Sequence, residues 1–238
     1  GLGDVYKRQI IGPSGCGKST LLMLIAGLRH PTGGELLVDG GRLDRPRPRT
    51  GLILQDYGLL PWATVWDNVA LGMRIRGFYG PDGKHSPRDQ EPVVIRERVD
   101  YWLARLDIAH LARHYPNQIS GGQRQRAAIA RTLVLQPDLL LMDEPFGALD
   151  ALTREDLQRL TLELHAEQGL TTLIVTHNIE EAVTMGNRIL VLGQPPTRRA
   201  SVVENPAAGH ADYRTSAEFH ARCNELRDRM VRRENALA

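Results

Sequence analysis

Cysteine, lysine and long apolar runs are all scarce in this chain of 238 residues. The two cysteines do not indicate a disulfide framework, and they fit a reducing compartment such as the cytoplasm. The longest apolar run, residues 21–28, is far shorter than a membrane span, so any membrane association has to come through a partner. Acidic and basic residues are interspersed and the formal net charge is only +2, which gives no reason to expect nucleic acid as a partner.

Lysine is so rare that the position of each one is informative. Only Lys7, Lys18 and Lys84 occur, and arginine supplies the remaining positive charge. Lys18 lies in the sequence GPSGCGKST at residues 12–20, which has the full G-x-x-x-x-G-K-[ST] spacing of a phosphate loop. A phosphate loop uses a compact point charge rather than a planar guanidinium, which accounts for a lysine in a chain that otherwise uses arginine.

The residues around this loop predict a strand, a turn and a helix. Ile10 and Ile11 end a buried strand, and residues 19–28 form an apolar helix whose N-terminus helps the backbone N–H groups to cradle phosphate. We expect Lys18 to reach the β- and γ-phosphates and Ser19 to ligate Mg²⁺. The alternative, a glycine-rich turn with a chance lysine, is disfavoured by the complete motif in this setting. The expected nucleotide-binding residues are Gly12, Ser14, Gly15, Cys16, Gly17, Lys18, Ser19 and Thr20.

Polar residues follow three further apolar stretches. Residues 139–142 run into Asp143 and Glu144, so both carboxylates lie at the C-terminal edge of a predicted parallel strand, where α/β sheets bind ligands. Asp143 is suited to the Mg²⁺ shell and Glu144 to polarising an attacking water. Gln55 and His177 follow predicted strands in the same way and are expected to face the γ-phosphate, with Gln55 also near the metal. Taken alone, Gln55 and His177 are better explained as ordinary strand-end residues, and only their position relative to the other motifs favours a role at the site. For Asp143 and Glu144 the alternative is a strand that runs into a solvated acidic turn, and the complete phosphate loop makes it the weaker interpretation.

A second glycine-rich turn opens a second helix. Ser120, Gly121, Gly122 and Gln123 open a predicted helix that runs through Leu135, and Ser120 is a good N-cap for it. The first turn of such a helix offers N–H groups and a positive dipole end to an anion. These four residues are therefore further candidates for phosphate contact.

Six elements in this order resemble the ATP-binding subunits of ABC transporters from about residue 10 to at least residue 192. They are the Walker A loop, Gln55 as Q-loop glutamine, residues 119–123 as signature, residues 139–144 as Walker B, residues 147–150 as D-loop ending in Asp150, and His177 as switch histidine. Ile119 stands where the family usually has leucine, a nearly volume-conserving exchange.

The resemblance implies a head-to-tail dimer of two ATPase subunits. Ser120 and Gly122 of one subunit would touch the γ-phosphate held by Lys18 of the other, and Asp150 would belong to the same site. Glu144 and His177 would align water for attack on the γ-phosphate of ATP, and catalysis would be mainly positioning and charge stabilisation. The implied cofactors are ATP and Mg²⁺.

The chain is similar to importer ATPases in particular. Residues 144–154 (EPFGALDALTR) are typical of importers, and residues 55–62 followed by 64–71 are similar to the nitrate, sulfonate and taurine uptake group. This implies transmembrane permease subunits as partners, indirectly a substrate-binding protein, and a peripheral location on the cytoplasmic face of the inner or plasma membrane. Trp62 has two equally supported interpretations: it anchors the permease, or it packs inside the helical subdomain. For Leu60 the packing interpretation is favoured.

The fold class expected is α/β: a P-loop NTPase with a RecA-like parallel sheet plus the ABC helical subdomain. We expect an ATPase domain over residues 10–193, its helical subdomain over about 64–135, and a C-terminal strand and helix extension over 194–238. Strands are predicted at 35–39, 51–55, 138–142, 171–175, 188–192 and 199–203, and helices at 151–168, 179–185 and 212–233. Residues 78–92 read as a polar loop.

The residues before Ile10 do not fit this fold. A strand beneath a phosphate loop should be apolar, but Lys7, Arg8 and Gln9 occupy its place. Residues 4–9 resemble the translation of a transposon-end adapter used in sequencing libraries. We therefore expect residues 1–9 to be a non-native scar and the family's N-terminal antiparallel β subdomain to be truncated.

Two other functions compete with import. One is a non-transport, soluble ABC-type ATPase that acts as a mechanical switch. Proteins of that class usually carry two ATPase modules in one chain, whereas this chain has one. The other is an inactive truncated fragment that only binds its partner.

Overall fold

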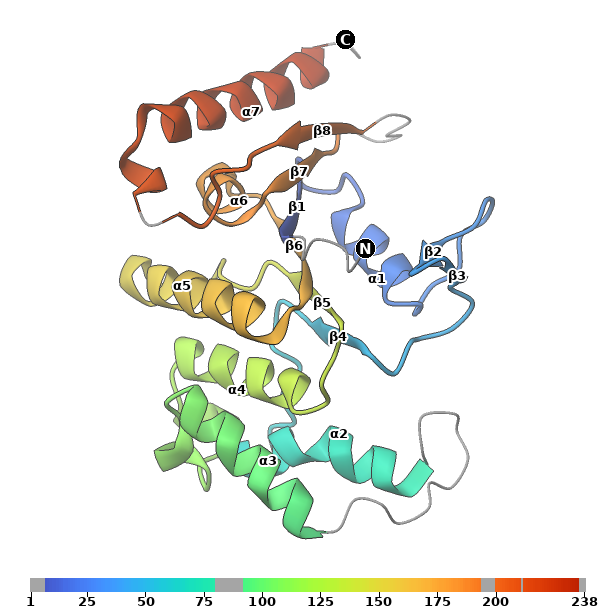
Figure 1. Cartoon of the computed structure of the whole chain (residues 1–238), viewed down its shortest axis with the longest axis vertical. Helices are drawn as coiled ribbons and strands as arrows, with labels where there is room; N and C mark the ends of the chain where they lie inside the picture. Colours follow the sequence, from blue (N-terminus) through green and yellow to red (C-terminus); the bar gives the residue numbers. More distant parts are fainter. Residues whose placement is uncertain (1–6, 80–91, 194–199, 211, 236–238) are drawn as a thin grey trace.

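The computed structural model describes residues 7–79, 92–193, 200–210 and 212–235, and its centre is a sheet of six strands (Figure 1). The strand order is β4-β5-β6-β1-β7-β8, in which neighbouring pairs are parallel except for the antiparallel pair β7–β8. The strands of this sheet are β1 (Lys7–Ile11), β4 (Thr50–Ile53), β5 (Leu139–Asp143), β6 (Thr171–Thr176), β7 (Arg188–Val191) and β8 (Ser201–Glu204). A two-stranded hairpin, β2 (Leu37–Val38) with β3 (Gly41–Arg42), follows the first helix.

The strand beneath the phosphate loop forms despite its polar sequence. β1 lies between β6 and β7, so its backbone groups are paired on both sides. Its side chains alternate between the two faces of the sheet, and Gln9, at 1% exposure, points into the interior with Ile174 and Ile189 as register partners. The expectation of a non-native start falls partly outside the described residues, because the structure begins at Lys7.

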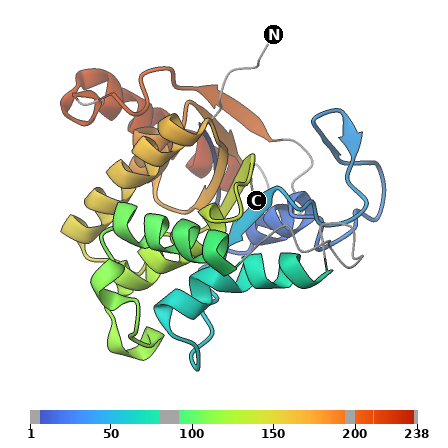
Figure 2. The same ribbon diagram turned by 60° about the horizontal axis from the view of Figure 1, so that its bottom comes forward.

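Helices cover both faces of the sheet (Figures 1 and 2). α1 (Lys18–Ile25) packs on one face, where Leu22 and Ala26 meet Ile10, Leu141 and other residues of the strands. On the other face lie α5 (Ala151–Gln168), α6 (Ile179–Met185) and the C-terminal helix α7 (Ala217–Asn235). This is the mostly parallel, helix-covered sheet of a P-loop NTPase.

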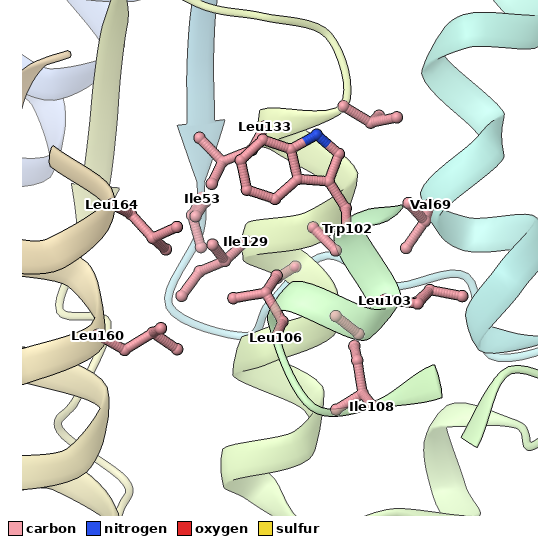
Figure 3. Close-up of a cluster of buried hydrophobic side chains, with 14 of the residues drawn as sticks. Ile53, Val69, Trp102, Leu103, Leu106, Ile108, Ile129, Leu133, Leu160 and Leu164 are labelled. Carbon is pink, nitrogen blue, oxygen red and sulfur yellow. The ribbon is translucent and has the colours of Figure 1, made fainter. Parts of the chain in front are cut away.

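Three helices form a separate layer beside β4 and α5. They are α2 (Val65–Tyr79), α3 (Pro92–Arg105) and α4 (Gly121–Leu133), with the short 3₁₀ turns η1 (Ala109–Leu111) and η2 (Pro116–Gln118) between α3 and α4. Their shared core is drawn in Figure 3, where Trp102 and Leu106 of the α3 segment point toward Ile129 and Leu133 of α4. The same cluster continues to Ile53 and to the leucines of α5, so this layer is packed firmly onto the sheet.

Several expected boundaries were wrong. The first helix ends at Ile25 rather than at residue 28, because Gly27 takes a φ of 73° and the N–H groups of Leu28 and Arg29 turn back to Met23 O. The strand expected at 35–39 is only Leu37–Val38, and it pairs with the short strand β3 in a hairpin. The helix expected at 212–233 begins at Ala217, after the 3₁₀ turn η3 (Tyr213–Thr215). Most of the polar loop expected at 78–92 lies outside the described residues.

Candidate active site

One edge of the sheet gathers the motifs that are far apart in sequence. The registers place Ile53, Met142, Ile174 and Gln9 side by side on β4, β5, β6 and β1. The residues that follow each of these strands must therefore emerge along one line at the C-terminal edge. Those residues are Gln55 after β4, Asp143 and Glu144 at the end of β5, His177 after β6, and the phosphate loop after β1.

The phosphate loop joins β1 to α1 through left-handed backbone. Gly15 and Gly17 have φ values of 77° and 98°, which a residue with a Cβ adopts only at a cost, so the motif glycines are needed here. Lys18 is buried at 6% exposure, and its Nζ donates to the carbonyls of Gly12 and Pro13, at 2.9 Å each. The ammonium group is thus held within the curve of the loop, and the Sγ of the buried Cys16 lies 4.0 Å from it.

Ser19 and Asp143 bring two oxygen ligands together. The Ser19 hydroxyl donates to Asp143 Oδ1 at 3.2 Å, across 124 positions of sequence. Burial raises the pKa of Asp143, opposed by the hydrogen bond from Ser19. Within the described residues no group of three or more His, Cys, Asp or Glu side chains is arranged to hold a metal ion. A hydroxyl and a single carboxylate suit Mg²⁺, which keeps waters and phosphate oxygens as its other ligands.

Glu144 and His177 are in direct contact. The Nδ1 of His177 lies 3.1 Å from Glu144 Oε2, with the imidazole 60% exposed and the carboxylate 20% exposed. Glu144 has a φ of 46°, unusual for a residue with a side chain, and its N–H donates to Val175 O at 2.9 Å. Such a conformation costs of the order of 1–3 kcal/mol and is characteristic of functional positions. The turn aims the carboxylate toward the residue that follows β6.

Gln55 is on the same edge but remains apart from these contacts. Its side chain is exposed, and no hydrogen bond in the described part of the chain joins it to Ser19 or Asp143. The strand order nevertheless puts β4 next to β5, so Gln55 flanks the carboxylates rather than the phosphate loop.

The signature residues form a complete capping box at the start of α4. Ser120 Oγ accepts from Gln123 N at 3.2 Å, and Gln123 Oε1 accepts from Ser120 N at 2.8 Å. Gly122 packs so closely on α5 that a Cβ there would lie 2.5 Å from Thr153 Cγ2. α4 and α1 lie apart in both ribbon views, so the signature does not reach the phosphate loop of its own chain (Figures 1 and 2).

Asp150 has a local role in the structure. It is the exposed N-cap of α5, and its Oδ1 accepts from Thr153 N at 3.0 Å. This backbone hydrogen bond lowers the pKa of Asp150.

The structure adds residues to the site that the sequence motifs do not identify. Arg154 donates to the carbonyls of Phe146 and Leu149, which lie between Glu144 and Asp150. Asn178 caps α6, and Glu181 is buried in the first turn of that helix at 4% exposure. The sequence does carry one indication that Glu181 is buried. It lies one helical turn before Met185, so a charged residue occupies the inward face of the predicted helix.

The segment between Gln55 and α2 presents one large aromatic side chain. Trp62 is 74% exposed, so of its two interpretations packing inside the helical layer is wrong, and the anchor for a permease stays a prediction. Leu60 is partly buried, in keeping with the packing interpretation. The buried Asn68 of α2 holds this segment: its Nδ2 donates to the carbonyls of Leu60 and Ala63, and its Oδ1 accepts from Leu60 N.

Comparison with known families gives one match that covers more than half of the chain. The family described as ABC transporter matches residues 5–147. This interval contains the phosphate loop, Gln55, the signature residues and the Asp143–Glu144 pair.

Similar proteins include import subunits and a solved cassette. The chain is 40% identical over 196 residues to the aliphatic sulfonates import ATP-binding protein SsuB of Bacillus cereus, covering 82% of this chain and 72% of that protein. It is 42% identical over 198 residues to the taurine import ATP-binding protein TauB of Pseudomonas aeruginosa, covering 83% and 71%. A dimeric structure of the ATP-binding cassette MJ0796, bound to ADP and Pi after hydrolysis, matches with a TM-score of 0.70 and 33% identity, over 84% of this chain and 87% of that one.

Proposed function

The chain belongs to the ABC transporter family, and from this premise we propose that it is the ATP-hydrolysing subunit of an importer that works through a separate membrane permease. The observation that carries the proposal is the convergence of the phosphate loop, the Ser19–Asp143 pair and the Glu144–His177 pair on one edge of the sheet. The similarity to sulfonate and taurine import subunits supports a substrate of that kind.

The phosphate loop binds the nucleotide through its backbone N–H groups and Lys18. To reach the β- and γ-phosphates, Lys18 Nζ exchanges its hydrogen bonds with Gly12 O and Pro13 O for bonds with phosphate oxygens. The buried position of the ammonium strengthens that interaction, because water screens it little.

Glu144 and His177 act on the γ-phosphate side. Glu144 accepts a hydrogen bond from the attacking water and orients it, and His177 holds the carboxylate through the 3.1 Å contact between Nδ1 and Oε2. The left-handed backbone at Glu144 fixes the direction from which the water is held.

Ser19 and Asp143 would hold Mg²⁺ through their oxygen atoms, and Gln55, at the same edge of the sheet, would lie near it. Bound together with ATP, Mg²⁺ would neutralise the negative charge that develops on the phosphate oxygens. Burial, which raises the pKa of Asp143, also weakens the screening of its carboxylate by water, and this favours an adjacent cation.

A second subunit completes the site. Ser120 and Gly122 at the start of α4 meet the γ-phosphate held by the partner's phosphate loop, and Asp150 lies beside them at the start of α5. The capped helix terminus and its separation from the chain's own phosphate loop support this arrangement, and the dimeric cassette structure gives a precedent.

The membrane permease binds near Trp62. In the described part of the chain no helix has both the length and the apolar character of a membrane span. A 74% exposed tryptophan, on a segment that Asn68 holds rigidly, is the kind of anchor that dominates protein interfaces. The similarity to import subunits supports a peripheral position on the cytoplasmic face, with a substrate-binding protein that delivers the substrate to the permease.

The test is Glu144→Gln, which keeps the size of the side chain and removes the carboxylate. The turnover number for ATP should fall about 100-fold or more, while ATP still binds and the subunit becomes dimeric on a sizing column. Glu97→Gln, an exposed change on α3, is the control and should behave as the unmodified chain does.

Three outcomes separate the candidate functions. Ordinary hydrolysis by the Glu144→Gln variant would remove Glu144 from its role. No hydrolysis by the unmodified chain, with or without permease, would favour an inactive fragment. Hydrolysis that no permease alters would favour a soluble ABC-type switch.

A further inference from the structure

The loop of residues 145–149 joins the end of β5 to the start of α5, and the two backbone hydrogen bonds that close its turns are long. Gly147 N donates to Glu144 O, and Leu149 N donates to Phe146 O, each at 3.3 Å. Backbone hydrogen bonds are usually shorter than this, so the two turns by themselves hold the loop weakly.

Arg154, in the first turn of α5, supplies stronger contacts to this loop. Its Nη2 donates to Leu149 O at 2.6 Å, and its Nε donates to Phe146 O at 3.3 Å. A charged donor makes shorter and stronger hydrogen bonds than a neutral one, and the guanidinium is a rigid planar fork. No carboxylate among the described residues forms an ion pair with Arg154, so both of its side-chain hydrogen bonds go to this loop.

At its start the loop lies against the side chain of Glu144. A Cβ on Gly147 would lie 3.7 Å from Glu144 O and 3.8 Å from Glu144 Oε2, which are ordinary van der Waals distances. Glu144 has a φ of 46°, and a residue with a side chain keeps this left-handed conformation only where the surrounding structure holds it. The direction of the carboxylate therefore depends on how firmly the loop is held.

At its end the loop lies against the signature turn. Leu149 is buried, and a Cβ on Gly121 would lie 3.3 Å from Leu149 Cδ2. The carbonyl of this same leucine accepts the shorter of the two hydrogen bonds from Arg154. Arg154 thus holds a loop that touches the proposed water-orienting carboxylate at one end and the turn offered to the partner's nucleotide at the other.

We propose that Arg154 is a positioning residue for ATP hydrolysis, which holds the loop of residues 145–149 against Glu144 and so fixes the direction of its carboxylate toward the attacking water. The inference rests on the proposed function. Neither hydrogen bond of the guanidinium involves the phosphate loop, so the affinity for ATP depends little on Arg154.

The test compares Arg154→Gln with Arg159→Gln, the same change at an exposed position of the same helix. Glutamine is a good helix former, so α5 is kept while the guanidinium is lost. Arg154→Gln should lower kcat about tenfold and change KM for ATP less than about twofold, whereas Arg159→Gln should leave both unchanged. Equal kcat values for the two variants, or a KM that rises as much as kcat falls, would overturn the proposal.

A double-mutant cycle separates the positioning of Glu144 from a general effect on the fold. Single-turnover hydrolysis of labelled ATP is measured for Glu144→Gln alone and combined with Arg154→Gln. Because residues that act as a unit have non-additive effects, the second substitution should lower the remaining rate less than about twofold. A further loss of about tenfold would mean that Arg154 does not act through the Glu144 carboxylate, and it would refute the proposal.

Arg154→Lys carries the test if Arg154→Gln fails to fold. Lysine keeps the charge, but its single ammonium does not match two carbonyls as the planar fork does, so kcat should fall about threefold while KM changes little. An unchanged kcat in Arg154→Lys would also overturn the proposal. Failure of the proposed function is distinct, because the unmodified chain would then not hydrolyse ATP at all.

Discussion

Replacing Gln9 by methionine tests whether the polar sequence of β1 weakens the fold. Gln9 is 1% exposed on the central strand, and its Oε1 has no hydrogen-bond partner among the described residues. Methionine is the suitable replacement because it is unbranched at Cγ, as glutamine is. A Cβ on Gly186 would lie only 2.4 Å from Gln9 Cγ, which shows how closely that atom packs and leaves no room for a branched side chain.

The expected effect is stabilisation by about 2 kcal/mol. An unsatisfied buried polar atom costs about 1–3 kcal/mol, and Gln9→Met removes that cost while keeping nearly the same volume. For a domain of this size each kcal/mol raises the melting temperature by about 2–4 °C, so Tm should rise roughly 4–8 °C. Calorimetry and urea unfolding of the two proteins measure both quantities.

Gln168→Met, at the exposed end of α5, is the control and should change stability by less than about 0.5 kcal/mol. A Gln9→Met variant no more stable than this control would refute the reasoning. It would mean that Oε1 is hydrated in the adjoining cavity of about 10 Å³, which is large enough for one water.

Two further predictions concern docking and pH. Trp62→Ala should leave basal hydrolysis unchanged but weaken permease binding about 30-fold, which corresponds to about 2 kcal/mol. The control is Leu37→Ala, an exposed change on the β2–β3 hairpin. Equal binding by the two variants would exclude Trp62 as an anchor. Burial, aided by the charge of Lys7, lowers the pKa of His165 to about 4, so the unfolded chain binds its proton first as pH falls below about 6.5. The folded state should therefore lose about 2 kcal/mol between pH 7 and pH 5 through His165, and urea unfolding of His165→Gln should show a smaller loss; identical losses would contradict the assignment.

Those parts of the site whose residues are neighbours in sequence could be predicted from the sequence alone. The phosphate loop, the Ser120–Gln123 capping box and the acidic end of β5 each depend on neighbouring residues, so spacing alone indicates them. The prediction of a sheet edge that collects these motifs follows from parallel strands in an α/β fold, and the strand order agrees with it.

Contacts between distant segments could not be predicted in the same way. The polar start of β1 argued against a strand at Lys7–Gln9, but pairing with β6 and β7 on both sides outweighs the side-chain preference.

Lys18 and Glu144 share a feature that bears on how the site works. Each is held by a partner within the protein: Lys18 donates to the carbonyls of Gly12 and Pro13, and Glu144 contacts His177. On the proposed mechanism, nucleotide binding exchanges the contacts of Lys18, whereas the Glu144–His177 contact persists while the water is held. Affinity for ATP and the rate of hydrolysis consequently depend on different contacts of the same sheet edge.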